Sequence, residues 1–146
     1  MDYKQLTEQL VNKCIKRGAD SAEVYCESSR NLSVRIRNGE METVQQAESH
    51  GVGIRVMVKG RMAFSSCNDL SDNSLDETIS SAVQFANSTT PDENNVLPED
   101  KGMTEVEGLY DPQTSQIPLE DKIDLAKEVE QLAMKDSRIT KSGGSR

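Results

Sequence analysis

The clearest alternation of apolar and polar side chains lies in residues 51–67. Val or Ile stands at every second position from 52 to 58, which is the period of a β-strand. Lys59-Gly60 then supplies a turn, because glycine tolerates the positive φ angles of a tight hairpin. Residues 61–67 return as a second strand, with Met62 and Phe64 on one face. Since apolar residues occur on both faces, we expect this hairpin to lie centrally in a sheet.

Two shorter alternating segments precede this hairpin. Residues 22–28 and 32–36 each place apolar side chains at every second position. Asn38-Gly39 follows, which is the strongest short-range signal for a hairpin with a type I′ turn. Residues 41–48 alternate poorly, so we expect a strand that frays or lies at an edge, where an extended peptide could pair with it.

The Asn38-Gly39 turn predicts a strand register if its loop has two residues. Two pairs of opposite charge and one apolar pair then face each other across the ladder: Arg37 with Glu40, Arg35 with Glu42, and Ile36 with Met41. Each such pair stabilises a hairpin by roughly 0.2–1 kcal/mol. For these arginines we prefer a solvated face to a ligand site.

Two amphipathic helices enclose the strands in the sequence. Residues 3–17 carry apolar side chains at helical spacing, and Gly18 is placed to end that helix. Ser74-Leu-Asp-Glu77 has the spacing of a capping box, in which the Ser hydroxyl accepts a hydrogen bond from the Glu backbone N–H. A helix is therefore predicted from this box to about Asn87.

Residues 91–116 have a different composition from what precedes them. Seven Asp and Glu residues stand against Lys101 alone, and no periodicity survives. The acidic residues lack the spacing of a calcium-binding loop, so a solvated connection is the better interpretation. Pro118 suits the first turn of a further helix, which is predicted to run to about Asp136. Its broad apolar stripe needs more partner surface than the rest of this chain offers easily.

The order of elements predicts an α+β fold with a mainly antiparallel sheet of about five strands and helices packed on one face. We predict an α+β domain at residues 1–90, an acidic connecting loop at 91–116, and a last segment at 117–146 that contains a helix and then the start of a strand at 138–140. A strand that begins so late suggests a fragment of a longer protein with a following domain.

Composition excludes several classes of protein. Leu, Ile, Val and Phe make up about a fifth of the 146 residues, so the core is small. The net charge of −8 argues against non-specific nucleic-acid binding and against an anionic membrane surface. No apolar run approaches the roughly 20 residues that span a bilayer. The first eight residues are polar, unlike a signal or transit peptide, so a cytoplasmic location is expected.

The candidate reactive groups are few. Cys14, Cys26 and Cys67 are widely spaced and form no C-x-x-C pair, which fits free thiols in a reducing compartment. Core packing is a better interpretation of Cys14 than a reactive thiol. His50 is the sole histidine, and a lone histidine is seldom a metal ligand or general base. No motif of a zinc, nucleotide or nucleophilic site occurs, so we predict no catalytic residue, no metal ligand and no assignable binding residue in this chain.

Several short motifs, through their order and spacing, resemble the N-terminal domain of the TldD/TldE (PmbA) proteins. They are Ala22-Glu-Val-Tyr25, Arg37-Asn-Gly-Glu40, Gly51-Val-Gly-Ile-Arg-Val56, Gly60-Arg-Met-Ala-Phe-Ser-Ser66 and Asn68-Asp-Leu-Ser71. Three later features resemble the TldE/PmbA branch: Gly108-Leu-Tyr-Asp-Pro112, the helix from Leu119, and Asp136-Ser-Arg-Ile-Thr-Lys-Ser-Gly143. The likeness covers nearly the whole chain.

This resemblance implies a subunit of a cytoplasmic metallopeptidase once described as a modulator of DNA gyrase. In that family TldD carries zinc at an H-E-x-x-x-H motif, and TldE is its partner without that motif. The pair cleaves unfolded or extended peptides as a heterodimer. The zinc ligands belong to a later region, so no metal residue is transferred to this chain. The implied partners are a TldD-like subunit or a second copy, together with an extended peptide, and neither nucleic acid nor a membrane.

A second hypothesis is a free-standing acidic α+β interaction module with no role in proteolysis. Its supports are the negative charge, the polar strand at 41–48 and the missing catalytic residues. Direct binding to gyrase or DNA is a more distant third, because the charge opposes it.

Overall fold

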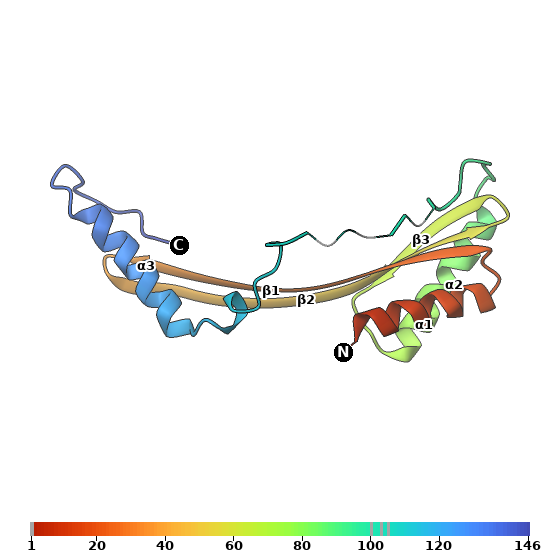
Figure 1. The fold of residues 1–146 in the computed structure, drawn as a ribbon, viewed down its shortest axis with the longest axis horizontal. Coiled ribbons are helices and arrows are strands. Elements are labelled where there is room, and N and C mark those ends of the chain that lie inside the picture. Colours follow the sequence, from red (N-terminus) through yellow and green to blue (C-terminus); the bar gives the residue numbers. More distant parts are fainter. Residues whose placement is uncertain (1, 100, 103, 105) are drawn as a thin grey trace. The chain divides into compact units, whose positions relative to one another are not determined.

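The fold was analysed in a computed structural model that describes residues 2–99, 101–102, 104 and 106–146. Within these residues three helices, three strands and one short 3-10 helix occur (Figure 1). In chain order they are α1 (Tyr3–Lys16), β1 (Ser21–Arg37), β2 (Glu40–Val58), β3 (Arg61–Cys67), α2 (Asp72–Ser88), the 3-10 helix (Thr114–Gln116) and α3 (Leu119–Met134). The strands form one sheet in the order β1-β2-β3. The predicted α+β class is therefore confirmed.

The prediction of about five strands is wrong, because two pairs of predicted strands are each continuous. Residues 22–28 and 32–36 both lie in β1, while 41–48 and 51–58 both lie in β2. Polar residues separate the two predicted strands of each pair and suggest that the strand ends there. The hydrogen bonds of a sheet are made by the backbone, however, so a strand can continue through polar side chains. Two cross-strand contacts lie in this polar stretch: Ser29 with Ser49 through their hydroxyls at 2.7 Å, and Arg30 with Glu48 at 3.3 Å.

The chain forms two compact units, and β1 and β2 contribute residues to both. Unit 1 contains Met1–Ser29 and Ser49–Lys101, and unit 2 contains Arg30–Glu48 and Gly102–Arg146. The predicted boundaries at residues 90 and 116 stay a prediction. The described residues between α2 and the 3-10 helix form turns and irregular backbone, as expected for the acidic connection.

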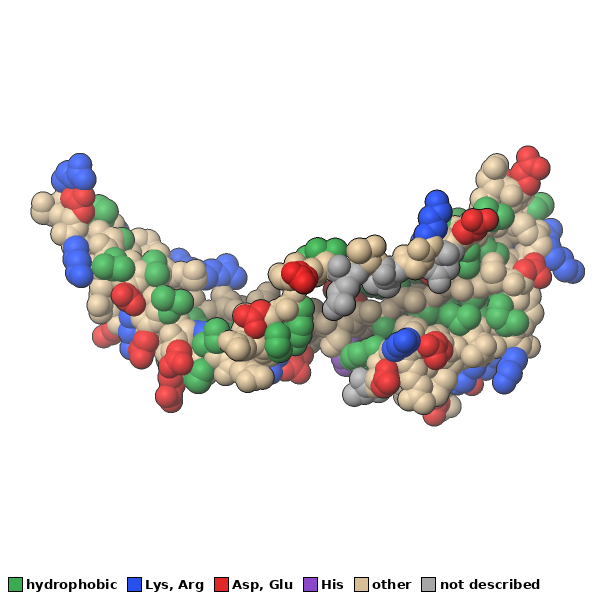
Figure 2. Space-filling model, in the orientation of Figure 1, with side chains coloured by type: hydrophobic (Ala, Val, Ile, Leu, Met, Phe, Trp, Pro, Cys, Tyr) green, Lys and Arg blue, Asp and Glu red, His purple; other side chains and the backbone are tan. Residues whose placement is uncertain are grey.

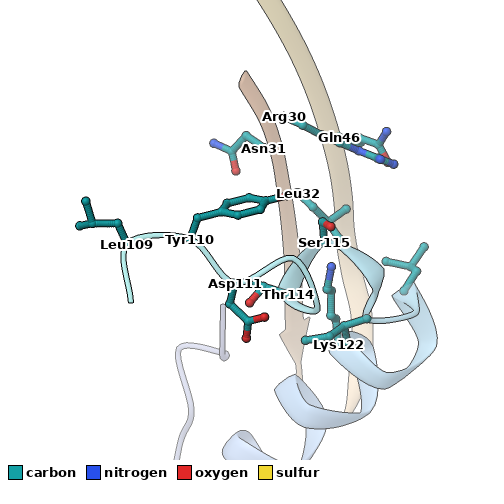
Figure 3. A pocket seen from close by; sticks show the side chains of 12 residues that line it. Arg30, Asn31, Leu32, Gln46, Leu109, Tyr110, Asp111, Thr114, Ser115 and Lys122 are labelled. Atoms are coloured by element: carbon teal, nitrogen blue, oxygen red, sulfur yellow. The ribbon is translucent and has the colours of Figure 1, made fainter. Parts of the chain in front are cut away.

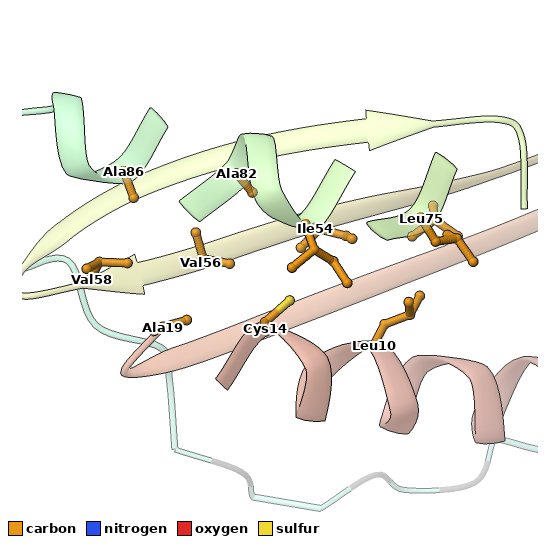
Figure 4. Packing of buried hydrophobic residues seen from close by; sticks show 11 residues of the cluster. Leu10, Cys14, Ala19, Ile54, Val56, Val58, Leu75, Ala82 and Ala86 are labelled. Carbon is orange, nitrogen blue, oxygen red and sulfur yellow. The ribbon is translucent and has the colours of Figure 1, made fainter. Parts of the chain in front are cut away.

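Unit 1 buries an apolar cluster between its helices and one face of the sheet (Figures 1 and 4). The helix side chains come from α1 and α2, and the sheet contributes the alternate positions 52–58 of β2. The fully buried members include Leu10, Cys14, Val52, Ile54, Val56, Leu75 and Ile79. Cys14 packs in this core, which confirms its structural interpretation.

The β2–β3 hairpin has the predicted turn. Lys59 and Gly60 both have positive φ angles, at 50° and 73°, and Val58 pairs with Arg61. The prediction of a central position is confirmed for β2 but wrong for β3, which lies at the edge. Ala63 packs against the core, whereas Phe64 on the opposite face is 58% exposed. The outer face of this hairpin therefore stays open to solvent.

The N-cap of helix α2 lies three residues before the predicted one, Ser74. It is Ser71, whose hydroxyl accepts a hydrogen bond from the backbone N–H of Ser74 at 3.4 Å. Asp69 in turn accepts hydrogen bonds from the backbone N–H and the hydroxyl of Ser71. This side-chain turn positions Ser71 as the cap, so the role predicted for Ser74 was wrong. Asp76 on α2 forms ion pairs with Lys13 of α1 at 2.9 Å and with Arg17, the C-cap of α1, at 3.0 Å.

In unit 2 the β1–β2 hairpin closes through the predicted type I′ turn. Asn38 and Gly39 have φ angles of 55° and 77°. Glu42 forms ion pairs with Arg35 at 2.9 Å and with Arg37 at 3.1 Å. The predicted pairing of Arg35 with Glu42 is thus confirmed. Arg37, which was predicted to face Glu40, forms its ion pair with Glu42.

Residues 41–48 lie at an edge, as expected, since the pairing of β2 with β3 begins only at Val52. They form regular strand and do not fray.

The strand predicted at residues 138–140 is wrong. Residues 137–138 form a turn, closed by a hydrogen bond from the Ile139 N–H to the Asp136 carbonyl at 2.9 Å. Strand-like pairing comes later, where Ser145 forms an antiparallel bridge with Ile36 of β1. The predicted helix before it is confirmed as α3, with Pro118 at its N-cap.

We expect Ile54→Ala to lower the free energy of unfolding by about 2–5 kcal/mol, because it leaves a cavity in the fully buried core of unit 1. Urea denaturation followed by circular dichroism measures this change. Met62→Ala removes an exposed side chain of the neighbouring strand and serves as the control, with a much smaller expected loss. Equal losses for the two variants would contradict the assignment of the core.

Candidate functional site

A hollow of unit 2 lies beside β1 and ahead of α3 (Figure 3). Its volume is about 670 Å³. The strands supply Arg30, Asn31, Leu32 and Gln46; the connection supplies Leu109, Tyr110, Asp111, Thr114, Ser115 and Ile117; and α3 supplies Leu119 and Lys122. The hollow combines apolar walls with the cationic side chains of Arg30 and Lys122 and the carboxylate of Asp111.

Tyr110 is the most prominent side chain of this hollow. Its ring extends toward Leu32 of β1 (Figure 3), yet 78% of the residue is exposed. Asp111 holds the following turn, because its carboxylate accepts the backbone N–H of Gln113 at 2.8 Å. The turn leads directly into the 3-10 helix, so backbone geometry places Tyr110 at the rim of the hollow.

The local charge of this hollow differs from that of the whole chain. Arg30 is paired with Glu48, but Lys122 forms no ion pair with any residue that the structure describes. A cation without a partner beside apolar walls favours a ligand that carries a carboxylate. This feature is local, since the chain as a whole carries a net charge of −8.

Glu130 connects α3 to the tip of the β1–β2 hairpin. It is only 4% exposed, and its two carboxylate oxygens accept the backbone N–H groups of Asn38 at 3.0 Å and Gly39 at 2.8 Å. The hydrogen bond from Gly39, with further ones from the Ser142 hydroxyl and Asn38, lowers the pKa of the Glu130 carboxyl below its ordinary value. Glu130 therefore binds this turn in its ionised form.

The apolar stripe predicted for α3 is only partly covered. Ile123 and Ala126 are half-buried, while Leu125, Val129 and Leu132 are exposed. Figure 2 shows hydrophobic side chains among charged ones on the visible surface of this segment. The sequence analysis missed Glu130 as a buried residue, although its position four residues after Ala126 places it on the half-buried face.

His50 lies in unit 1, away from any cluster of metal ligands. It lines an open hollow on the outer sheet face together with Tyr25, Gly53, Phe64 and Cys67. Among the described residues, no group of three or more His, Cys, Asp or Glu side chains is placed to hold a metal ion. The structure thus brings His50 close to one cysteine but not into a donor set.

The three cysteines are free thiols in the structure. Burial raises the pKa of the Cys14 thiol, and burial together with the nearby Cys67 raises the pKa of Cys26. A raised pKa lowers the thiolate fraction at neutral pH, so Cys14 and Cys26 are poor nucleophiles. Their chemistry is that of packing residues.

The fold and the site together define an α+β domain with an antiparallel sheet and exposed apolar side chains. Its helices, as far as the structure describes them, are too short or too polar to cross a bilayer. Residues 22–86 match the family model described as PmbA/TldA metallopeptidase domain 1. By this match and by the curated relatives, the chain resembles the N-terminal domain of the PmbA/TldD metallopeptidase family.

Two curated relatives support this assignment. The chain is 28% identical to Metalloprotease PmbA of Escherichia coli O157:H7, over 97% of its own length and 32% of the relative. It is 30% identical to the Metalloprotease PmbA homolog of Haemophilus influenzae, over 99% of its own length and 32% of the relative. The chain therefore spans about a third of the length of these relatives.

Solved structures share the fold. A protein from Bacteroides thetaiotaomicron described as a proposed modulator of DNA gyrase has a TM-score of 0.77 at 29% identity, covering 88% of this chain and 30% of that one. TldE from Thermococcus kodakarensis has a TM-score of 0.62 at 20% identity, covering 85% of this chain and 29% of that one. The second likeness shows the fold alone.

We expect the Glu130 contact to stabilise unit 2 above the ordinary glutamate pKa near 4.5, and to be lost as the pH falls through the lower folded-state pKa. Glu130→Gln replaces one acceptor oxygen by an amide donor that faces the turn N–H groups, so it should destabilise at neutral pH and flatten the acid limb. Thermal unfolding between pH 7 and pH 3 measures both effects.

Glu128→Gln is the matched control, because Glu128 is an exposed glutamate on the same helix. Its pH profile should follow that of the unmodified protein. If Glu130→Gln gave the same profile as Glu128→Gln, the carboxylate would not hold the turn.

Proposed function

We propose that this chain is the N-terminal, non-catalytic part of a TldE/PmbA-like subunit of a zinc metallopeptidase heterodimer that degrades or processes unfolded peptides. The observation that carries the proposal is the match of residues 22–86 to the first domain of a metallopeptidase family. The names of the curated relatives, both PmbA metalloproteases, support the same role.

The donor set of the chain does not fit a zinc site. Structural and catalytic zinc sites need three or four His, Cys, Asp or Glu ligands around one point, and the described residues contain no such group. No step of hydrolysis is therefore assigned to this chain, and the zinc of the proposed heterodimer belongs to the TldD-type partner.

The proposed contribution of the chain is to bind and orient. The hollow around Tyr110 offers apolar walls and the cation of Lys122 to an extended peptide, and the exposed apolar residues of α3 offer a surface to a partner subunit. The proposed partners are thus a TldD-like subunit or a second copy, and a peptide, in the cytoplasm. Neither nucleic acid nor a membrane surface belongs to this proposal.

A free-standing interaction module is the second candidate. The exposed side chains of Leu109, Tyr110 and Val129 favour it, since large apolar residues gathered at a surface commonly mark interaction sites. This candidate predicts peptide or protein binding without any effect on proteolysis.

Mixing the full-length protein with a TldD-type subunit should produce zinc-dependent cleavage of an unfolded peptide that neither protein cleaves efficiently alone. The rate of peptide cleavage is measured for each protein and for the mixture, with and without a zinc chelator. A TldD-type subunit whose H-E-x-x-x-H glutamate is replaced by Gln is the control and should give no cleavage in the mixture.

Two results would contradict the proposal. Cleavage by the mixture at the rate of the TldD-type subunit alone would leave the interaction module as the better interpretation. Zinc-dependent hydrolysis by this chain on its own would contradict both candidates.

A further inference from the structure

The turn of the β1–β2 hairpin contains the one Asn-Gly pair of the sequence, Asn38-Gly39. Both residues are exposed, and their φ angles are 55° and 77°. Asn-Gly suits this turn because Asn and Gly adopt positive φ angles more readily than other residues. The same pair is also the Asn dipeptide most prone to deamidation, because glycine has no side chain to shield its backbone nitrogen from the preceding amide.

Deamidation of this pair proceeds through a five-membered ring. The Gly39 backbone nitrogen loses its proton and attacks Cγ of Asn38, so that an N–C bond forms. The bond from Cγ to Nδ2 breaks, and the amide nitrogen leaves as ammonia with that proton. Water then opens the succinimide at one of its two carbonyl groups. Opening at Cγ yields an aspartate, and opening at the backbone carbonyl yields an isoaspartate, so water is the single co-reactant.

The carboxylate of Glu130 on α3 holds the nitrogen that would attack. The Gly39 N–H donates to Glu130 Oε2 at 2.8 Å, and the Asn38 N–H donates to Oε1 at 3.0 Å. Glu130 is only 4% exposed, so water competes little for these hydrogen bonds. The two bonds also restrain the backbone on both sides of Asn38 against the rearrangement that closes the ring.

The charge of Glu130 opposes the first step of the reaction. Attack requires a deprotonated Gly39 nitrogen, which would place a negative charge beside an ionised carboxylate. A neighbouring charge of the same sign disfavours ionisation, and the hydrogen bond that holds the proton would be lost as well.

We propose that Asn38-Gly39 is a deamidation site of this protein and that the Glu130 carboxylate of α3 keeps its reaction slow. While α3 is bound to the turn, the asparagine persists. When α3 leaves the turn, the pair reacts at the rate of an unfolded peptide. This inference concerns a modification of the chain and does not depend on the proposed peptidase role.

The modification weakens the contact that suppresses it. An isoaspartate adds one carbon to the backbone between the two N–H groups, so they no longer match the two oxygens of Glu130 in a two-residue turn. An aspartate adds a negative charge to the turn beside that carboxylate. Either product therefore favours release of α3 from the hairpin.

The rate of deamidation is measured on the purified protein at neutral pH. A glutamate-specific protease and mass spectrometry follow conversion of the amide at position 38 to a carboxyl group, and enzymatic methylation detects isoaspartate. We expect Glu130→Gln to accelerate the reaction about tenfold, because the hydrogen bonds to an ionised acceptor are lost. Glu128→Gln, at an exposed position of the same helix, should leave the rate unchanged.

Two further variants separate the carboxylate from general stability. Ile36 is 0% exposed in β1, so Ile36→Val loosens the same unit without removing a hydrogen bond of the turn. Its deamidation rate should stay close to that of the protein without substitutions while both remain folded. Asn38→Gly places Gly-Gly in the turn, which suits both positive φ angles, and should abolish the reaction at this position.

Several results would overturn the proposal. They are no deamidation at position 38 in Glu130→Gln, equal rates in Glu130→Gln and Glu128→Gln, and equal acceleration by Ile36→Val. A protein without substitutions that reacts as fast as a synthetic peptide of residues 33–44 would also overturn it, because the turn would then be unprotected.

Hydrogen exchange measures the effect of the modification on α3. Ion-exchange chromatography separates the deamidated protein by its added charge. Backbone amides of residues 119–134 should exchange faster in this fraction than in the intact protein. Equal exchange in the two fractions would contradict the release of α3.

Discussion

The pairing of β1 with β2 is the interaction on which the rest of the structure depends. These strands are 17 and 19 residues long and contribute to both compact units. Their backbone hydrogen bonds continue through a polar stretch where no side chain is buried, so the ladder does not rely on apolar burial there. In unit 1 the core helices α1 and α2 pack on its alternate apolar positions, and in unit 2 α3 is bound to its turn.

Both tight turns of the sheet are held by a carboxylate from outside the hairpin. Glu130 accepts the N–H groups of Asn38 and Gly39, and Asp20 accepts the N–H of Lys59 at 2.5 Å. A type I′ turn leaves backbone donors without ladder partners, and an ionised carboxylate satisfies them strongly. A carboxylate thus holds the turn at each end of β2: Glu130 of α3 holds the turn before the strand, and Asp20, which follows α1, holds the turn after it.

The described residues offer exposed apolar surface but no set of metal-ligating side chains. The described residues of this chain contain no group of three or more metal ligands, and Cys14 and Cys26 are packing residues. The domain offers exposed apolar side chains on α3 and the cation of Lys122, which forms no ion pair with any described residue. Exposed apolar side chains gathered at a surface commonly take part in contacts with other chains.

The sequence by itself determined the presence of the helices, the positions of both tight turns and the alternating core positions of β2, because these depend on local φ angles and on side-chain period. The continuity of β1 and β2, the buried Glu130 and the Ser145 bridge were decided only by the tertiary structure. Each depends on backbone hydrogen bonds between residues far apart in the chain, and such bonds leave no mark on local composition.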